Sequence, residues 1–300
     1  MNKLLLLILT GCLLACTHRK QNATIRIATK PMTEQAILGE MLGLLIAEHT
    51  GLAVSITQGI SGGTGSIHPA LVKGDFDLYP EYTGTGWLVV LKKDSMLPPE
   101  ELYEELKKEY LLKYDLRWIA PYGFSNTYSL AVDTGKAQQY GLAAFSDLAR
   151  YPDVLSFGAE YDFFEIPQGY DALCDYYGLK FKKATEMNIQ SKYNAIESGR
   201  TDVINVFTTD GPLSEGRLKV LNDDKNFFPP SYCATVIRQE TLSLHPELEK
   251  VLMKMKDVLT NREMSELNYL VDVAGKPERE VAACFLKKKG LLNENKNYGK

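Results

Sequence analysis

Tyrosine is the residue type whose placement most clearly suggests binding chemistry, because 17 tyrosines occur among the 300 residues. Four aromatic segments stand in polar, small-residue contexts beside expected strands, at residues 79–87 (YPEYTGTGW), 124–128 (FSNTY), 207–211 (FTTDG) and 228–232 (FPPSY). Loops at strand ends are where α/β proteins place ligands. Each aromatic residue taken alone fits a core or rim position, whereas four such segments together favour one shared aromatic pocket.

The sequence offers no constellation for catalysis or for a metal. None of the four histidines has a metal-ligand spacing: His18, His49, His68 and His245. Nothing local pairs His68 with Cys233 or a serine as base and nucleophile. The glycine-rich loop at residues 59–66 lacks the lysine of a P-loop, so a strand-to-helix connection near a cleft is favoured over nucleotide binding. We therefore expect neither an enzyme nor a cofactor.

The first residues predict secretion and a lipid anchor. After Lys3, residues 4–14 form an apolar run of about 11 residues, and a membrane-spanning helix needs roughly 20. The sequence LLAC at residues 13–16 resembles a bacterial lipobox, which predicts a signal peptide over residues 1–15 and lipidation of Cys16. Residues 16–23 would then be a polar tether. An ordinary signal peptide, or a plain helix, is the alternative.

Composition describes an ordinary globular protein, with 45% hydrophobic and 24% charged residues. The mature chain of roughly 280 residues exceeds a typical single domain and suggests two lobes. Its formal charge of −4 becomes −5 once Lys3 is lost, and the absence of a basic block argues against nucleic acid as a partner. The remaining cysteines, Cys174, Cys233 and Cys284, are too few and too widely spaced for a disulfide framework. At most one bridge is expected.

Hydrophobic periodicity predicts alternating strands and helices along the whole chain. Strands are expected at residues 24–28, 52–57, 76–79, 117–119, 128–132, 155–158, 202–206 and 233–237. Helices are expected at residues 33–49, 66–73, 99–110, 170–177, 192–199, 245–256, 265–274 and 278–288. This alternation favours α/β layers with mostly parallel sheets. Because no long linker separates two halves, the chain is expected to cross between lobes more than once.

Five segments in order resemble the glycine betaine/carnitine/choline-binding proteins of ABC transporters. They are residues 28–35 (ATKPMTEQ), 77–85 (DLYPEYTGT), 124–128 (FSNTY), 208–211 (TTDG) and 228–232 (FPPSY). The resemblance implies a two-lobed type II periplasmic binding protein fold, with two interlobe crossings and a ligand cleft between the lobes. It places the first lobe at residues 24–124 and 231–300, and the second at residues 125–230.

The resemblance also implies an aromatic cage for the ligand's head group. Matched position by position, the cage residues are Tyr82, Tyr128, Phe207 and Tyr232. A trimethylammonium group has no N–H for an acceptor to bind, whereas aromatic faces offer it negative quadrupole and apolar surface. Four rings would contribute about 2–8 kcal/mol before association costs. Micromolar affinity is therefore reasonable once the ligand's polar end is added.

Matching the family further assigns Lys30 and Thr85 to the ligand's oxygen atoms, and gives Asn126 a weaker role as an acceptor near the methyl groups. Two positions depart from the family pattern. Phe207 replaces a usual tyrosine and loses its hydroxyl, and Ile166 replaces an arginine that in betaine-binding relatives grips the ligand carboxylate. The head group is therefore better defined than the tail, and choline, carnitine or a larger betaine such as ergothioneine stay open.

These inferences predict an extracytoplasmic, lipid-anchored and monomeric substrate-binding protein. Its partners would be a small quaternary ammonium ligand (glycine betaine, choline, carnitine or a related betaine) and the permease and ATPase of an ABC importer. One alternative is a protein of the same fold for another solute, such as ergothioneine, an amino acid or an oxyanion. A ligand-sensing lipoprotein is another. A two-lobed lipoprotein enzyme is the third, and it lacks the constellation it would need.

Overall fold

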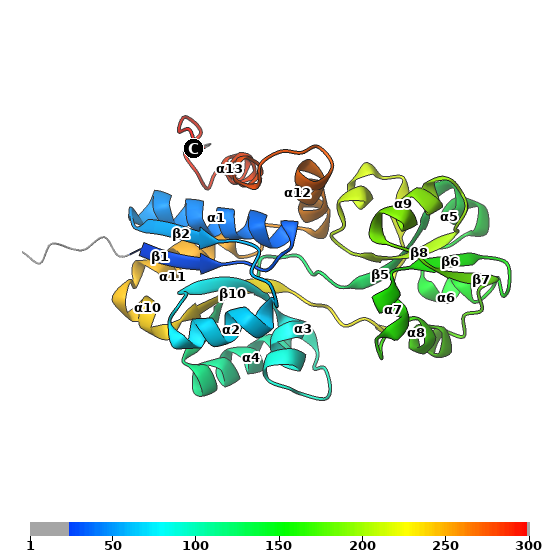
Figure 1. Ribbon diagram of the computed structural model, residues 1–300, viewed down its shortest axis with the longest axis horizontal. Helices are drawn as coiled ribbons and strands as arrows, with labels where there is room; N and C mark the ends of the chain where they lie inside the picture. The colour runs from blue at the N-terminus through cyan, green and yellow to red at the C-terminus, as the bar shows by residue number, and fades with distance from the viewer. Residues whose placement is uncertain (1–23, 299–300) are drawn as a thin grey trace, which may run out of the picture.

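The computed structural model describes residues 24–298. The expected signal peptide (residues 1–15), tether (residues 16–23) and lipidation site Cys16 therefore lie outside the described residues. Two bodies, each with its own five-stranded sheet, lie one after the other along the long axis of the molecule (Figure 1). This arrangement is the two-lobed α/β fold that the sequence predicts.

The first sheet combines strands from both ends of the chain in the order β2-β1-β3-β10-β4. Its strands are β1 (Thr24–Ala28), β2 (Ala53–Thr57), β3 (Leu78–Tyr82), β4 (Leu116–Ile119) and β10 (Cys233–Arg238). β1 runs parallel to β2 and β3, whereas β10 is antiparallel to β3 and β4. Because β5 to β9 belong to the other sheet, the chain leaves this lobe after β4 and returns to it at β10.

The second sheet is ordered β7-β6-β8-β5-β9. Its strands are β5 (Tyr128–Asp133), β6 (Ser156–Ala159), β7 (Lys183–Glu186), β8 (Val203–Phe207) and β9 (Leu218–Val220). β6 is parallel to β7 and β8, whereas β5 is antiparallel to β8 and β9. In each sheet four of the five strands therefore point the same way, and one strand, β10 or β5, runs against them; the sheets are mostly parallel, as expected, with one reversed strand each. The strands β5 and β10 enter their sheets from the other lobe, so no strand–helix–strand crossover fixes their direction.

Helices cover both faces of the first sheet (Figure 1). They are α1 (Thr33–Thr50), α2 (Thr64–Lys73), α3 (Thr83–Thr85), η1 (Gly86–Val90), α4 (Pro99–Tyr114), α10 (Gln239–Leu244), α11 (Glu247–Leu252), η3 (Met253–Met255), α12 (Asn261–Asp272) and α13 (Glu278–Lys288). Strand residues alternate between two cores: Ile237 packs with α1 and α13, and its neighbour Val236 packs with α2 and α4. The single helix expected at residues 245–256 is instead α11 followed by the short turn η3.

The second lobe has a core of its own, rich in phenylalanine. Its helices are α5 (Thr134–Tyr140), α6 (Phe145–Leu148), α7 (Tyr161–Glu165), α8 (Tyr170–Tyr177), α9 (Ile189–Glu197) and η2 (Gly211–Glu215). Local caps set some helix starts: Asp133 accepts a hydrogen bond from the backbone N–H of Lys136 at 3.1 Å. α8 ends at Gly178, whose φ of 69° is the left-handed conformation that glycine adopts at low cost.

Two segments of chain, residues 125–127 and 229–232, connect the lobes and are bonded to each other. Ser125 and Tyr232 form an antiparallel bridge. The N–H of Asn126 donates to the carbonyl of Ser231 at 3.0 Å, and the N–H of Ser231 donates to the Ser125 hydroxyl at 2.8 Å. The two crossings therefore form one paired hinge.

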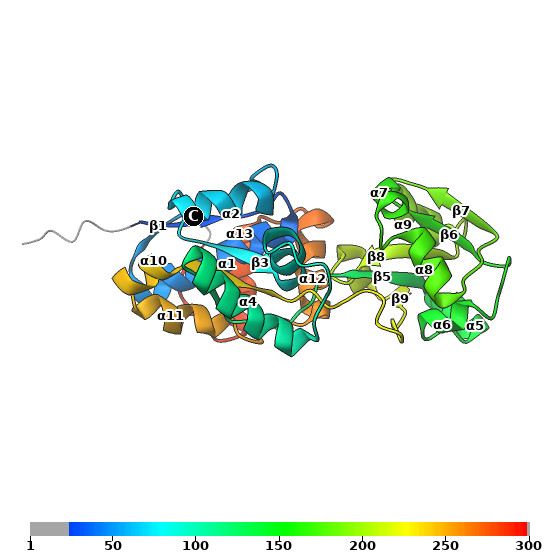
Figure 2. The ribbon, with the colours of Figure 1, turned by 90° about the horizontal axis from the view of Figure 1, so that it is seen from below.

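Helix α12 of the first lobe also contacts the second lobe, and lies on the side that faces it (Figure 2). The Ser265 hydroxyl donates to the carbonyl of Asp210 at 2.7 Å, and the Asn268 amide donates to the carbonyl of Thr209 at 2.8 Å. A Cβ at Gly211 would lie 3.0 Å from the backbone nitrogen of Tyr269, so a small residue is needed there. These contacts hold the loop after β8 against the first lobe.

Candidate functional site

The second lobe presents a stacked pair of aromatic rings. Tyr128, the first residue of β5, lies directly opposite Phe207, the last residue of β8. Their ring centroids are 4.4 Å apart with an interplanar angle of 28°. Tyr128 is supported by Phe163 and Phe228, with centroids at 5.2 and 5.8 Å. Phe207 is 36% exposed, so one side of this stack is open to a ligand.

Ionisable groups lie around the stack. The Asp210 carboxylate accepts hydrogen bonds from the backbone N–H of Phe207 at 2.9 Å and from the Tyr193 hydroxyl at 2.5 Å. Burial raises the pKa of Asp210. Lys192, fully buried, forms an ion pair with Glu160. Asp210 therefore fixes the backbone from which the Phe207 ring projects.

Burial raises the pKa of Tyr128, and the nearby carboxylates of Glu160, Asp162 and Asp210 raise it further. A phenol surrounded by negative groups resists losing its own proton. Because Glu160 is paired with Lys192, the carboxylates that would favour a cation near the stack are Asp162 and Asp210. The second lobe thus offers apolar ring surface with acidic groups close by.

In the first lobe, Tyr82 ends β3 opposite Cys233 of β10. Its side chain is only 6% exposed, and its hydroxyl donates to the Glu34 carboxylate at 2.5 Å. The Lys30 ammonium lies 4.8 Å from the centroid of the Tyr82 ring and forms an ion pair with Glu81. In this conformation, therefore, Lys30 already has a carboxylate partner, and one side of the Tyr82 ring already has a cation.

The other predicted site residues lie close to the hinge. Tyr232, half-buried, belongs to the second crossing, where its backbone N–H donates to the Thr83 hydroxyl at 3.0 Å. Thr85, also half-buried, is the last residue of α3. The Asn126 amide nitrogen donates to Glu34 at 3.1 Å, while its buried Oδ1 has no partner among the described residues.

The structure thus brings Tyr128 and Phe207 into direct contact in the second lobe, and places Tyr82 in the first lobe and Tyr232 in the second crossing. Within residues 24–298, no ring-to-ring contact joins the first pair to the second. Whether all four rings enclose one ligand stays a prediction.

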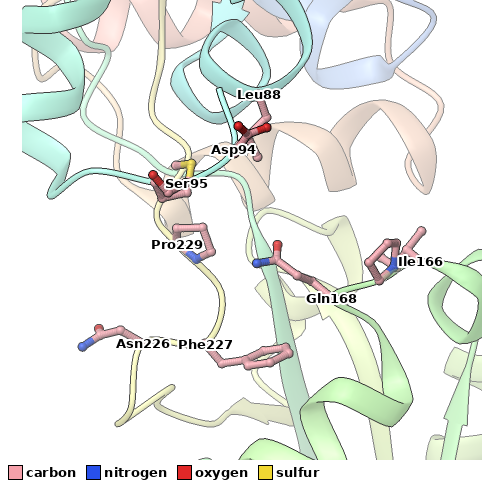
Figure 3. Close-up of a pocket in the computed structure, with 10 residues that line it drawn as sticks. Leu88, Asp94, Ser95, Ile166, Gln168, Asn226, Phe227 and Pro229 are labelled. Carbon is pink, nitrogen blue, oxygen red and sulfur yellow. The ribbon is translucent and has the colours of Figure 1, made fainter. Parts of the chain in front are cut away.

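A cavity of about 480 Å³ lies between the lobes (Figure 3). The first lobe contributes Leu88, Asp94, Ser95 and Met96, and the second lobe with its return crossing contributes Ile166, Pro167, Gln168, Asn226, Phe227 and Pro229. None of the four cage residues lines it, but Phe227 contacts Phe228, which in turn contacts Tyr128. Two phenylalanine rings of the second lobe therefore connect the cavity to the aromatic stack.

The lining of this cavity contains no lysine or arginine. Its ionisable side chain is Asp94, and Gln168 and Asn226 add amides to a largely apolar wall. Ile166 lies where the family resemblance implies an arginine, and it packs against the core of the second lobe. A ligand carboxylate would find no cationic partner here.

Sequence reasoning missed the role of Glu34, although it lies within the ATKPMTEQ segment. Glu34 is buried, at 3% exposure, and accepts the hydroxyl of the predicted cage residue Tyr82. Helical spacing could have found it, because Glu34 precedes Leu38, Met41 and Leu45 at intervals that place all four on one side of α1. No sequence pattern predicted that Glu160, Lys192 and Asp210 lie near Phe207, because only the fold of the second lobe brings them together.

In the part of the chain that the structure describes, two other kinds of site come into question, a metal centre and a membrane-spanning helix. Residues 24–298 contain no group of three or more His, Cys, Asp or Glu side chains that could hold a metal. His68 packs edge-on against Tyr110 and Tyr114, with centroids at 5.5 and 4.6 Å. Over the same residues no helix has the length and apolar character needed to cross a bilayer.

The cysteines Cys174, Cys233 and Cys284 are free. Burial raises the pKa of the Cys174 thiol to about 11.

Two lobes on separate sheets, two paired crossings and a cavity lined from both lobes define a two-lobed substrate-binding protein. A family model described as the substrate binding domain of an ABC-type glycine betaine transport system matches residues 23–288. The chain belongs to this family of extracytoplasmic binding proteins, whose members serve transport and are not enzymes.

Two curated relatives are named for different compounds, ergothioneine and carnitine. The chain is 44% identical over 265 residues to the ergothioneine transport permease/ergothioneine binding protein EgtU of Helicobacter pylori, a match that covers 88% of this chain and 47% of that protein. The chain therefore spans about half the length of this relative. It is 34% identical to the carnitine transport binding protein OpuCC of Listeria monocytogenes, over 97% of this chain and 94% of OpuCC.

Solved structures agree with this assignment. The crystal structure of a glycine betaine/carnitine/choline ABC transporter superposes with a TM-score of 0.86 at 32% identity, over 90% of this chain and 100% of its own. The ligand-free YehZ protein of Escherichia coli superposes with a TM-score of 0.78 at 25% identity, over 90% of this chain and 99% of its own.

Proposed function

We propose that this protein captures a betaine through its trimethylammonium group and delivers it to an ABC importer. The observation that carries the proposal is the Tyr128–Phe207 stack, which is open on one side, has acidic groups near it and adjoins an interlobe cavity. Such a surface suits a bulky cation without N–H groups better than a small amine, which would prefer directional carboxylate contacts.

Ergothioneine is the ligand that this site favours within the betaine class. It carries a trimethylammonium group and a carboxylate on one carbon, and an imidazole-thione ring beyond them. The cavity beside the stack has amide and apolar lining and no cation, and so suits a neutral ring. Ile166 removes the guanidinium that a small betaine would use, and a relative that is 44% identical is named for ergothioneine.

Capture requires the two lobes to act on the same ligand. The stack belongs to the second lobe, and Tyr82 and Thr85 belong to the first. A ligand stabilises a closed arrangement only through contacts that both lobes make at once. The paired crossings provide the hinge for that movement.

The setting follows from the family and from the first residues. We propose that the chain acts as a monomer, anchored through lipidated Cys16 outside the cytoplasm, and that a permease and an ATPase are its partners. A single acyl-modified cysteine attaches a protein to a membrane surface without spanning it.

Isothermal titration of the purified, unlipidated protein tests this function. The ligands would be ergothioneine, glycine betaine, carnitine and choline, with L-histidine as the matched control that lacks the three methyl groups and the thione. The proposal predicts micromolar or tighter binding of ergothioneine and no binding of histidine. Absence of heat and of a thermal shift with all four methylated compounds would reject it.

A further inference from the structure

Glu34 is a buried carboxylate that joins four separate parts of the molecule. It lies in the first turn of α1 and is 3% exposed. The Tyr82 hydroxyl donates to its Oε1 at 2.5 Å, and the Asn126 amide donates to the same oxygen at 3.1 Å. The Asn268 amide approaches Oε2 at 3.5 Å, and the Thr209 hydroxyl completes the set of donors.

These donors come from functionally different segments. Tyr82 ends β3 in the first lobe, and Asn126 belongs to the first crossing. Thr209 belongs to the loop after β8 in the second lobe, close to Phe207 and Asp210. Asn268 lies on α12, and also donates to the carbonyl of Thr209 at 2.8 Å. One side chain therefore connects a predicted cage ring with the hinge and with the second lobe.

A carboxylate in the first turn of α1 suits the helix dipole, but the dipole does not explain why this carboxylate is buried. α1 is buried along most of its length, and its other buried residues are apolar or neutral. Burial raises the pKa of Glu34, while the four donors oppose that shift. Removing a charged group from water is costly, and packing an apolar residue in its place is often neutral or stabilising. The carboxylate is better explained by the groups that it orients.

We propose that Glu34 is a positioning residue of the ligand site, which orients the Tyr82 ring and links it to the first crossing and to the loop after β8. The proposal rests on the proposed betaine-binding function. A tyrosine ring whose hydroxyl is hydrogen-bonded presents a fixed face to the ligand, so binding loses less side-chain conformational entropy. Because the same carboxylate contacts Asn126 and Thr209, a displacement of the Tyr82 ring also strains the contacts between the lobes.

The test is a double-mutant cycle on ligand affinity. Glu34→Gln keeps the shape of the side chain but replaces one acceptor oxygen by an N–H₂ group that faces donors. Tyr82→Phe keeps the ring and removes the hydroxyl. The cycle compares the wild-type protein, both single variants and the double variant, with ergothioneine as the probe and glycine betaine as a second probe. Glu48→Gln is the matched control, because Glu48 lies on the same helix and pairs with Lys296 away from the site.

A positioning role predicts that each single variant weakens binding by about tenfold, and that the double variant is weaker than either single variant by no more than about threefold. Glu48→Gln should bind like the wild type. A purely structural role would lower the melting temperature of Glu34→Gln and leave the dissociation constants of all folded variants unchanged. Fully independent losses, in which the double variant weakens binding by about a hundredfold, would also overturn the proposal.

Two outcomes distinguish a failure of this inference from a failure of the proposed betaine-binding function. If the wild-type protein binds none of the betaines, the proposed function fails and this inference fails with it. If the wild type binds and Tyr82→Phe binds within about twofold of it, only the positioning role is rejected. Tyr82→Phe decides the question even if Glu34→Gln does not fold, because it breaks the same hydrogen bond from the other partner.

Discussion

Replacing Phe207 by leucine isolates the contribution of the aromatic face to ligand binding. Leucine keeps most of the apolar surface and removes the ring quadrupole, which contributes about 0.5–2 kcal/mol to a desolvated cation. The dissociation constant should therefore rise by about 2- to 30-fold. Phe207 is 36% exposed, so the cost to folding comes mainly from the lost stack with Tyr128, about 0.5–1.5 kcal/mol. The variant should fold and lose only a few degrees of thermal stability.

The assay is isothermal titration with ergothioneine, at one salt concentration for all variants. Phe181→Leu is the matched control, since Phe181 is a partly buried ring of the same lobe, 5.0 Å from Phe157 by ring centroids and absent from the cavity lining. Its affinity should equal that of the wild type. Equal affinity of Phe207→Leu and wild type, with both proteins folded, would refute the assignment of Phe207 as a binding surface.

Three further experiments test other parts of the site. Ile166→Arg adds a guanidinium to a cavity lining that has none, and should raise the affinity for glycine betaine about tenfold relative to that for ergothioneine. An unchanged ratio of these two affinities, measured by calorimetry, would show that the carboxylate of glycine betaine does not reach this cavity. Lys30→Met leaves the buried Glu81 carboxylate unpaired and should lower the free energy of unfolding in urea by about 3–5 kcal/mol. Adding Glu81→Gln should restore most of that free energy, because it removes the unpaired charge. An unchanged free energy of unfolding for Lys30→Met alone would contradict the role of this ion pair. Burial raises the pKa of Asp210 above its ordinary value of 3.8, so folding favours the protonated form of this carboxyl group. Compared with Asp210→Asn, the wild type should therefore be most stable below pH 3.8 and should lose stability as the pH rises through the raised pKa. A difference in urea-unfolding free energy between the two proteins that does not change with pH would refute this prediction.

Much of the fold could be predicted from the sequence because most elements follow regular periodicity. The strand at residues 24–28 and the helices at 170–177 and 278–288 have the expected bounds. β3 is the informative exception, since it was expected at residues 76–79 and is found at Leu78–Tyr82. Proline and glutamate are rare in strand interiors, but here the Glu81 charge is paired with Lys30. Tyr82 therefore ends a strand and does not lie in the loop after it.

The sites that depend on contacts between distant segments could not be predicted in the same way. Strand direction in each sheet depends on which segments return from the other lobe, and a single strand's pattern carries no information about its neighbour's direction. The exposed strand β7 (KATE) lacks the hydrophobic alternation that predicts a strand, and β9 (LKV) is too short, at three residues, for its alternation to be recognised. The environment of Lys30 likewise depends on Glu81, which is 51 residues away in the sequence. The sequence alone therefore does not distinguish a lysine that is free to bind a ligand from one that is paired with a carboxylate.

A crystal structure of the protein with bound ergothioneine tests the central claim most directly. The account predicts closed lobes, with the quaternary nitrogen within about 6 Å of the ring centroids of Tyr82, Tyr128, Phe207 and Tyr232. The imidazole-thione ring should point toward Ile166 and Gln168. A ligand bound with its methylated nitrogen away from the Tyr128–Phe207 stack would contradict it.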